Sequence, residues 1–336
     1  MIYIKTKYGS VVQSLYGSAI ITRLPCCAVE RYGRVSVPES REIVKCRIGD
    51  HMIGVIGGSG LYEIEELDQK TTVLLESIYG APSAPAVIGS IGNLEFAFLP
   101  RHGLNHQLNP SEINYRANIE GLKRIGVDKI VSISAVGSLK EEHEPGKFIV
   151  IDQYIDRTFK RKSTFFQGGC VAHVPFGDPV CRVLSNSIIT ALEKNKFGHS
   201  NKGTYLCIEG PQFSTRAESL LYRSWGCDVI GMTNMPEAKL AREEGICYAS
   251  LAMVTDYDCW HPEHDDVSIE AIYKVMKANT SNAHTLIKSF SALTNMNEKS
   301  CSHCSSDVSD IVITTSVDKD QSFLDLIKTT KFNNES

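Results

Sequence analysis

Residues 248–260 read YASLAMVTDYDCW. The first seven of these residues are mostly apolar or small, which predicts a buried β-strand. Asp256 and Asp258 come directly after it, and side chains two residues apart on an extended chain point to the same side. Because two acids on one side repel each other, we expect the pKa of one carboxyl group to rise and that group to keep its proton near neutral pH.

A protonated carboxyl group beside an ionised one can donate one hydrogen bond and accept another. The edge of an adenine ring needs that combination, since its N7 accepts and its 6-amino group donates. The alternative interpretation of an Asp-x-Asp sequence is a solvated turn after a strand. Which interpretation applies depends on the rest of the chain.

The composition is that of a globular protein without a strong charge imbalance. The chain has 336 residues, 42% hydrophobic and 22% charged, enough for one large α/β domain or two ordinary ones. A net charge of -4 argues against nucleic-acid binding. No apolar run reaches the roughly 18 residues that a membrane span needs. We therefore expect a cytoplasmic protein, with the nucleus as a second location, that binds neither nucleic acid nor membrane.

The cysteines point to the same compartment. There are 11 of them, scattered along the chain, with Cys26-Cys27 and Cys301-x-x-Cys304 as the close pairs. In a chain of this size we expect reduced thiols. Residues 301–304 could form half of a zinc site, but no second ligand pair follows them. The sequence therefore predicts no bound metal.

The chain divides into three regions. Residues 1–50 lack a clear period and predict a poorly ordered N-terminal extension, with a targeting segment as the alternative. Residues 51–294 carry the strand and helix patterns, and residues 295–336 form a polar tail with little expected structure. For the middle region we predict a single α/β domain with a central mixed, twisted sheet flanked by helices. Strands are expected at residues 86–91, 94–99, 127–133, 147–151, 203–208, 228–231 and 248–254.

Polar groups follow several of these strands. Ser59 lies in a glycine turn, residues 134–138 form a second turn with glycine and hydroxyl groups, and Thr233 adds a third hydroxyl. Arg101 offers a planar fork and His102 a second donor, a pairing that suits an oxyanion. In open α/β sheets ligands gather at strand ends, so we expect these groups to converge.

Further candidates lie near predicted helix starts. A helix is expected to begin at residues 109–112, and Ser214 is expected to cap a helix at 217–225. Phe213 offers a flat apolar face, and Met232 could cover a sugar or pack in the core.

Several motifs occur in order between about residue 52 and residue 293: Gly57-Gly58-Ser59-Gly60, Arg101-His102-Gly103, Ala135-x-Gly137-Ser138, Glu209-Gly210-Pro211-x-Phe213-Ser214, Met232-Thr233 and Thr255-Asp256-Tyr257-Asp258. By these motifs the chain resembles the 5'-methylthioadenosine phosphorylases of the trimeric purine nucleoside phosphorylase superfamily. In that superfamily the Asp-x-Asp marks the branch that takes 6-aminopurines, whereas the 6-oxopurine branch carries an Asn in this region.

The resemblance assigns roles to residues that match the motifs. It implies a phosphate site made of Ser59, Arg101, His102, Ser134, Ala135 (through its N–H) and Thr233. It implies substrate contacts from Met232 at the ribose, Asp256 and Asp258 at adenine, Phe213 and Ser214 beside the base, Ile269 and Ile272 facing the methylthio group, and His173 reaching into a neighbouring subunit.

The implied reaction is phosphorolysis of 5'-methylthioadenosine to adenine and 5-methylthioribose 1-phosphate, in purine and methionine salvage. The catalytic residues would be Asp256 and Asp258, the assembly a homotrimer, and inorganic phosphate a co-substrate, with no cofactor. The alternatives are an adenosine or general purine nucleoside phosphorylase, a hydrolase of the same superfamily, and a nucleoside-binding protein without catalysis. The preference for methylthioadenosine over adenosine is left open.

Overall fold

A computed structural model describes residues 2–5, 11–15, 18–21, 51–58, 61, 67–167, 171–261, 269–293, 301 and 304, apart from the side chains of residues 2–5, 11–15, 18–21, 269–274 and 276. The chain forms two compact units, Met1–Lys45 and Cys46–Ser336. The first unit contains a three-stranded antiparallel sheet of β1 (Ile2–Lys5), β2 (Val11–Leu15) and β3 (Ser18–Ile21). Of the predicted tail, only Cys301 and Cys304 lie within the described residues.

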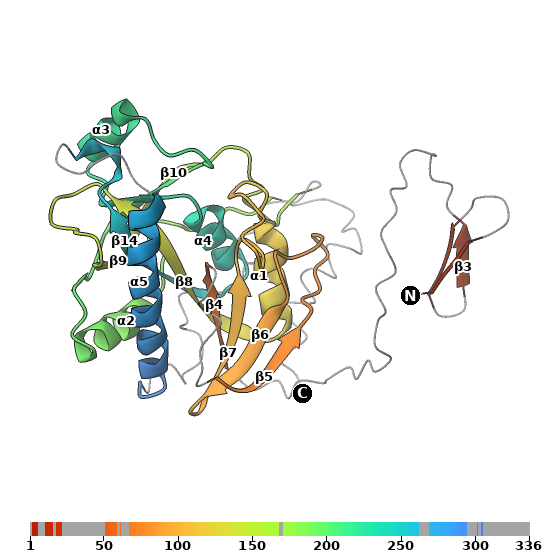
Figure 1. Cartoon of the computed structure of the whole chain (residues 1–336). Helices are drawn as coiled ribbons and strands as arrows, with labels where there is room; N and C mark the ends of the chain where they lie inside the picture. The colour runs from red at the N-terminus through yellow and green to blue at the C-terminus, as the bar shows by residue number, and fades with distance from the viewer. Residues whose placement is uncertain are drawn as a thin grey trace. The chain divides into compact units, whose positions relative to one another are not determined.

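The second unit is built on a mixed sheet of 11 strands among the described residues (Figure 1). Its strands are β4 (Met52–Gly57), β5 (Asp68–Val73), β6 (Ala86–Ile91), β7 (Leu94–Pro100), β8 (Val127–Ser138), β9 (Phe148–Ile151), β10 (Gln153–Arg157), β11 (His199–Ser200), β12 (Thr204–Ile208), β13 (Val229–Gly231) and β14 (Cys247–Asp256). Its helices are α1 (Tyr115–Arg124), α2 (Arg182–Lys194), α3 (Arg216–Ser224), α4 (Asn234–Glu243) and α5 (Ile269–Phe290), with a short 3-10 helix η1 (Asp258–Trp260). The predicted mixed sheet with flanking helices is confirmed.

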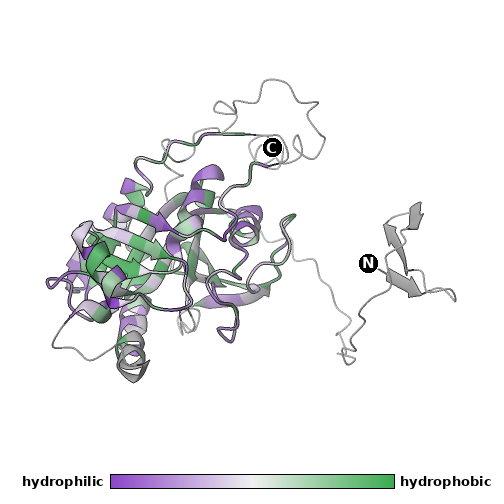
Figure 2. Ribbon diagram, turned by 90° about the horizontal axis from the view of Figure 1, so that it is seen from above, coloured by the Kyte–Doolittle hydropathy of each residue, from purple (hydrophilic) through white to green (hydrophobic). Residues whose placement is uncertain are grey.

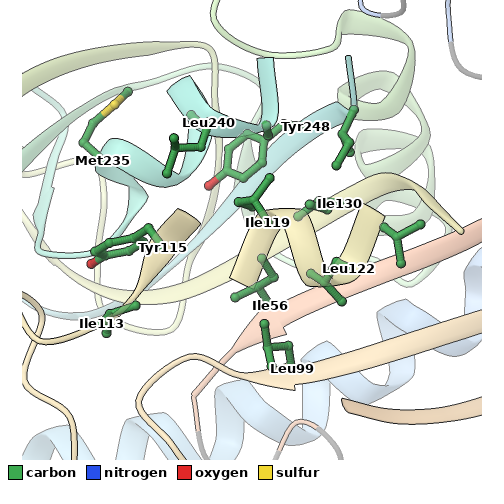
Figure 3. Close-up of a cluster of buried hydrophobic side chains, with 14 of the residues drawn as sticks. Ile56, Leu99, Ile113, Tyr115, Ile119, Leu122, Ile130, Met235, Leu240 and Tyr248 are labelled. Carbon is green, nitrogen blue, oxygen red and sulfur yellow. The ribbon is translucent and has the colours of Figure 1, made fainter. Parts of the chain in front are cut away.

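The centre of the sheet consists of β7, β4, β8 and β14, which run parallel to one another. Helices cover both of its faces, which explains why these strands are apolar almost throughout. On one face, strand residues such as Ile56 and Tyr248 pack against Ile119 of α1 and Leu240 of α4 (Figure 3). Figure 2 shows the hydrophobic residues gathered on these central strands.

The other face of the sheet packs against α2 and α5. In β14 the residues between those of the first face, such as Ala249 and Leu251, join Ile188 of α2 and Phe290 of α5 in a second core. Successive residues of β14 thus face the two cores in turn, as expected for a strand that is buried on both sides. Among the described helices, none combines the length and the apolar surface needed to span a bilayer.

The structure corrects two predicted boundaries. Residues 134–138 are not a turn but the last part of β8, because β14 and β13 both pair with this segment. The predicted helix start at residues 109–112 is also wrong, since α1 begins at Tyr115. Asn114 is its N-cap and accepts a hydrogen bond from the Ala117 N–H.

Candidate active site

The polar residues expected at strand ends lie at one edge of the sheet. Arg101 follows β7 and Asp256 ends β14, and the strands between them, β4 and β8, run in the same direction. Three inter-strand spacings separate β7 from β14, which amounts to about 14 Å. The anion-binding candidates and the acid pair are therefore on the same side of the sheet.

The two acids meet through a turn rather than along an extended chain. Asp258 has a φ of 51°, and its backbone N–H donates to Asp256 Oδ1 at 2.8 Å. Asp258 Oδ2 accepts a hydrogen bond from the Ser219 hydroxyl at 2.5 Å. The prediction that the two carboxyl groups lie close together is confirmed, but the extended conformation assumed for it is wrong.

Burial is the main reason for the titration behaviour of this pair. It raises the pKa of Asp256, although hydrogen bonds from Thr255 and from the Asp258 N–H oppose the shift. It also raises the pKa of Asp258, and the charge of Asp256 adds to that rise as a smaller cause. The predicted direction is therefore correct, but the cause is desolvation more than mutual repulsion.

Thr255 helps to define the protonation state of Asp256. Its Oγ1 lies 3.1 Å from the Val136 carbonyl oxygen and 2.7 Å from Asp256 Oδ2. A hydroxyl group has one proton, so it cannot donate to both oxygens. When it donates to the Val136 carbonyl, Asp256 Oδ2 must carry the proton shared with Thr255. When it donates to Asp256 Oδ2 instead, it stabilises the ionised form, so the arrangement accommodates both protonation states of Asp256.

Gly137 leaves room for the acid pair. A methyl group added there would lie 3.0 Å from Asp256 Oδ1 and 3.3 Å from Asp258 Cβ. Because Gly137 is paired on one side with β14 and on the other with β13, its backbone has little freedom to move away. The side chains of Asp256, Asp258 and Ile230, whose Cγ2 would be 3.2 Å from the methyl group, would have to shift instead.

We therefore expect Gly137→Ala to lower kcat/KM for the nucleoside by about 10- to 100-fold, because a small displacement of reacting groups has effects of this size. Steady-state kinetics at saturating phosphate measure it. Gly198→Ala is the matched control, since a methyl group there meets nothing within 4 Å. A native kcat/KM for Gly137→Ala would show that the acid pair needs no such clearance.

Two hydroxyl groups predicted to hold phosphate lie beside each other. Ser134 of β8 donates to Asn234 Oδ1 at 3.3 Å, and Thr233 directly precedes that residue. Ser134 and Thr233 are each 6% exposed. Ala135 is exposed although its neighbours along β8 are buried, so this central strand is open to solvent at that point. The structure thus brings three of the predicted phosphate residues together.

His102 is neutral at pH 7. Burial lowers its pKa to about 4, and its Nδ1–H donates to the Leu108 carbonyl at 2.9 Å. Its ring stacks on His106 with 4.3 Å between centroids. The remaining ring nitrogen, Nε2, is therefore a hydrogen-bond acceptor rather than the second donor that the sequence suggested.

Arg101 is almost fully buried, at 1% exposure. Its Nε and Nη2 donate to the two carboxylate oxygens of Glu237 at 2.8 and 3.1 Å. Nη2 also donates to Ser132 Oγ and to the Ile56 carbonyl, and Nη1 donates to the Ile133 carbonyl. The guanidinium group predicted to bind phosphate thus faces a carboxylate. Of its N–H protons, one on Nη1 has no acceptor among these bonds.

Residues 213–215 differ from the expectation for this helix start. The cap of α3 is Thr215, which exchanges hydrogen bonds with Glu218 in a capping box. The prediction that Ser214 caps this helix is therefore wrong. Instead, its hydroxyl oxygen is buried and has no hydrogen-bond partner among the described residues, which leaves it available to a ligand. Phe213 is 61% exposed.

Arg161 is a site residue that the sequence did not indicate. It donates to the carbonyl oxygens of Ile208, Glu209, Met232 and Met235. These main-chain oxygens and its side-chain partners, Tyr115 and Glu209, come from separate segments, so no local pattern could predict it. By holding the Met232 carbonyl, Arg161 fixes the turn that presents both Met232 and Thr233.

Glu209 supports Arg161 and the loop before it. It lies 3.3 Å from Arg161 Nε and accepts hydrogen bonds from the Ser111 hydroxyl and the Phe159 N–H. Burial raises the pKa of Glu209, but these bonds outweigh burial and hold it below its ordinary value. Glu209 is therefore a carboxylate that positions its neighbours rather than an acid.

The remaining predicted residues are placed less completely. Ser59 and the side chains of Ile269 and Ile272 lie outside the described residues. Met232 packs beside Gly210, where an added methyl group would come within 2.5 Å of its Sδ. His173 is exposed on the segment after β10.

Comparison with known proteins first defines the class. A family model described as the phosphorylase superfamily matches residues 52–292. A methylthioadenosine phosphorylase from an antarctic soil metagenomic library has a similar crystal structure, with a TM-score of 0.75, 46% identity and coverage of 82% of this chain and 98% of that one. The methylthioadenosine phosphorylase of Schistosoma mansoni, determined in complex with adenine, gives a TM-score of 0.72 at 30% identity and covers 80% of this chain and 99% of that one.

Relatives with similar sequences identify the family within this superfamily. The S-methyl-5'-thioadenosine phosphorylase of Koribacter versatilis is 54% identical over 236 residues, which cover 70% of this chain and 81% of the relative. That of Rhodospirillum rubrum is 54% identical over 241 residues, covering 72% and 82%. The chain belongs to the phosphorylase superfamily and, within it, to the S-methyl-5'-thioadenosine phosphorylase family.

Proposed function

We propose that this chain catalyses phosphorolysis of 5'-methylthioadenosine to adenine and 5-methylthioribose 1-phosphate. The observation that carries the proposal is the burial of Asp256, which raises the pKa of its carboxyl group even though the hydrogen bonds from Thr255 and from the Asp258 N–H oppose that shift, as suits a group that holds a proton. That group lies at the same edge of the sheet as the hydroxyls of Ser134 and Thr233. The family supports the same reaction.

The chemistry follows from the charges that develop when the N-glycosidic bond breaks. The sugar gains positive charge and the departing base gains negative charge. Phosphate beneath C1' acts both as nucleophile and as counter-charge to the sugar. Asp256 turns its proton from Thr255 Oγ1 to N7 of adenine and donates it there, which makes the base a better leaving group. Neither a covalent enzyme intermediate nor a cofactor is needed for these steps.

Phosphate recognition uses donors and an acceptor. The hydroxyl group of Thr233 donates to a phosphate oxygen, that of Ser134 turns from Asn234 Oδ1 to do the same, and the N–H of Ala135 adds a donor from the open part of β8. Neutral His102 offers Nε2 to the P–OH group of hydrogen phosphate, which is itself a donor. The contributions of Ser59 and Arg101 stay predictions based on the family resemblance.

At the base, Asp258 accepts from the 6-amino group of adenine, and the unpaired Ser214 hydroxyl lies in the segment expected beside the ring. The ribose contact of Met232, the methylthio contacts of Ile269 and Ile272, and the entry of His173 into a neighbouring site belong to the same proposal. So do the homotrimer, the role in purine and methionine salvage, and the cytoplasmic location.

One substrate panel tests the reaction. Adenine release from methylthioadenosine is expected only when inorganic phosphate is present, with inosine inert because its 6-oxo group accepts where the 6-amino group donates. Chromatography of the products, with and without phosphate, with methylthioadenosine, adenosine and inosine, measures it. Cleavage that persists without phosphate would favour the hydrolase, and adenine binding without turnover would favour a binding protein. The relative rates with methylthioadenosine and adenosine give the 5' preference.

A further inference from the structure

Four cysteine side chains converge at a place far from the acid pair. Cys181 immediately precedes α2, Cys247 begins β14, and Cys301 and Cys304 come from the segment after α5. Their four sulfur atoms all lie within 4.8 Å of one another. Since Asp256 ends the strand that Cys247 begins, about 30 Å of β14 separates this cluster from the candidate active site. Figure 1 shows α2 and α5 side by side near this part of β14.

Two of the six sulfur–sulfur distances are close to those of a metal-centred tetrahedron, and all six are within 4.8 Å. Cys301 Sγ lies 3.5 Å from Cys181 Sγ and 3.8 Å from Cys247 Sγ. A tetrahedral zinc ion with bonds of about 2.3 Å places its sulfur ligands about 3.8 Å apart. A disulfide needs a sulfur–sulfur distance of about 2.05 Å, and none of the seven described cysteines from 181 to 304 forms one.

The surroundings of the cluster favour a metal site over four packed thiols. Cys181, Cys247 and Cys304 are buried and belong to the apolar core beneath α2 and α5. Single buried cysteines act as small hydrophobic groups, and such groups have no reason to point four sulfur atoms at one spot. The backbone N–H of Cys301 also donates to Cys247 Sγ at 3.4 Å, a contact that stabilises a thiolate ligand.

We propose that Cys181, Cys247, Cys301 and Cys304 bind one structural zinc ion. All four positions of the tetrahedron are taken by protein sulfur atoms, so no position is open for a substrate, as is usual for structural zinc. The ion ties the segment of Cys301 and Cys304 to the beginnings of α2 and β14. Tetrahedral sulfur coordination suits zinc, and the Cys-x-x-Cys spacing of residues 301–304 is one that zinc sites use.

A zinc ion at this place differs from the expectation of no metal that the sequence gives. Residues 301–304 supply two of the four ligands, and the other two do not follow them in the sequence. They lie instead 120 and 54 residues before Cys301, at two positions that are themselves far apart. Only the folding of α2 against β14 brings these two cysteines together.

We expect the full-length chain, purified under reducing conditions without chelators, to contain about one zinc ion per chain. Elemental mass spectrometry measures this metal content. Exchange for Co²⁺ should give the thiolate-to-cobalt charge-transfer bands and the visible d–d bands of a tetrahedral sulfur site. Removing the metal with a chelator should lower the Tm by at least about 5 °C, because a ligand bound only to the folded state stabilises it.

Variants link the metal to these side chains. Cys301→Ser and Cys304→Ser are each expected to lose most of the zinc, whereas Cys227→Ser, which changes a buried cysteine outside the cluster, should keep it. Cobalt spectra of the unaltered chain decide the matter if the serine variants fail to fold. A reduced chain that takes up neither zinc nor cobalt would overturn the proposal. So would iron in place of zinc, or a disulfide between any two of the four cysteines.

Discussion

Asp256→Asn is expected to lower kcat for methylthioadenosine phosphorolysis by about 100-fold or more and to leave KM nearly unchanged. An asparagine has the shape of a protonated carboxyl group. Its Oδ1 can still accept from the Asp258 N–H, and its Nδ2 can donate to Thr255 Oγ1, which then donates to the Val136 carbonyl. What the amide lacks is a proton that it can give to N7 of adenine.

Because the variant keeps every hydrogen bond of the protonated acid, its Tm should match that of the unaltered chain. Kinetics with methylthioadenosine and phosphate, together with thermal unfolding, measure both quantities. Glu141→Gln is the control, since that carboxylate pairs with His261 near the same segment but its side chain is 68% exposed. A near-native kcat for Asp256→Asn would refute the acid assignment, and a large loss of Tm would show that Asp256 is ionised in the folded chain.

The raised pKa of Asp256 also predicts a pH dependence. Since the protonated form is the active one, kcat/KM should fall on the alkaline side, tenfold per pH unit, once the pH exceeds the pKa of this group in the free enzyme. The folded chain binds this proton more tightly than the unfolded chain. The stability from Asp256 is therefore fully present below its unfolded pKa and is lost as the pH rises through the folded pKa. Asp256→Asn should lack both effects.

The sequence predicted best where the information is local. The apolar strand before Asp256 and the strands at 86–91 and 94–99 follow from short patterns, and the structure contains them as β14, β6 and β7. The end of β8 could not be predicted in this way. Glycine at 137 suggests a turn, but the segment is extended because two other strands pair with it.

Functional residues were predicted by chemical type and motif, and their partners were not. The acid pair was recognised, but the Thr255 hydroxyl acquires its role only through the Val136 carbonyl on a neighbouring strand. Arg161 acts through carbonyl groups from distant segments. In each case the missing information is a contact between residues far apart in the chain, which a motif does not contain.

The Arg101–Glu237 pair is expected to give the largest effect on stability. Glu237 accepts from Arg101, from Ser132 and from Tyr248 in a site where both charged side chains are at most 2% exposed. Arg101→Met or Glu237→Leu alone leaves one buried charge without its partner, at a cost of about 3 to 5 kcal/mol in the free energy of unfolding. For a domain of this size that lowers the Tm by about 6 to 20 °C.

The double variant separates the ion pair from phosphate binding. Arg101→Met with Glu237→Leu removes both charges, so most of the lost stability should return, because well-packed apolar side chains often replace a buried pair without loss. Denaturant unfolding of the two single variants and the double variant measures this coupling. Arg182→Met is the control, since its pair with Asp178 is exposed and contributes at most about 1 kcal/mol. If the double variant lost as much stability as the two single variants together, the two residues would not act as a pair.

The same double variant also tests the role of the Arg101 Nη1 proton that donates to no acceptor among the described residues. If that proton meets phosphate, as the family resemblance implies, its loss should raise the KM for phosphate by about tenfold or more, the effect of one hydrogen bond to a charged group. The KM for methylthioadenosine should change much less. An unchanged KM for phosphate in a chain whose stability has recovered would assign Arg101 to the fold alone. Phosphate would then be left to Ser134, Thr233 and the neutral His102, and its recognition would depend on hydroxyl donors rather than on an opposite charge.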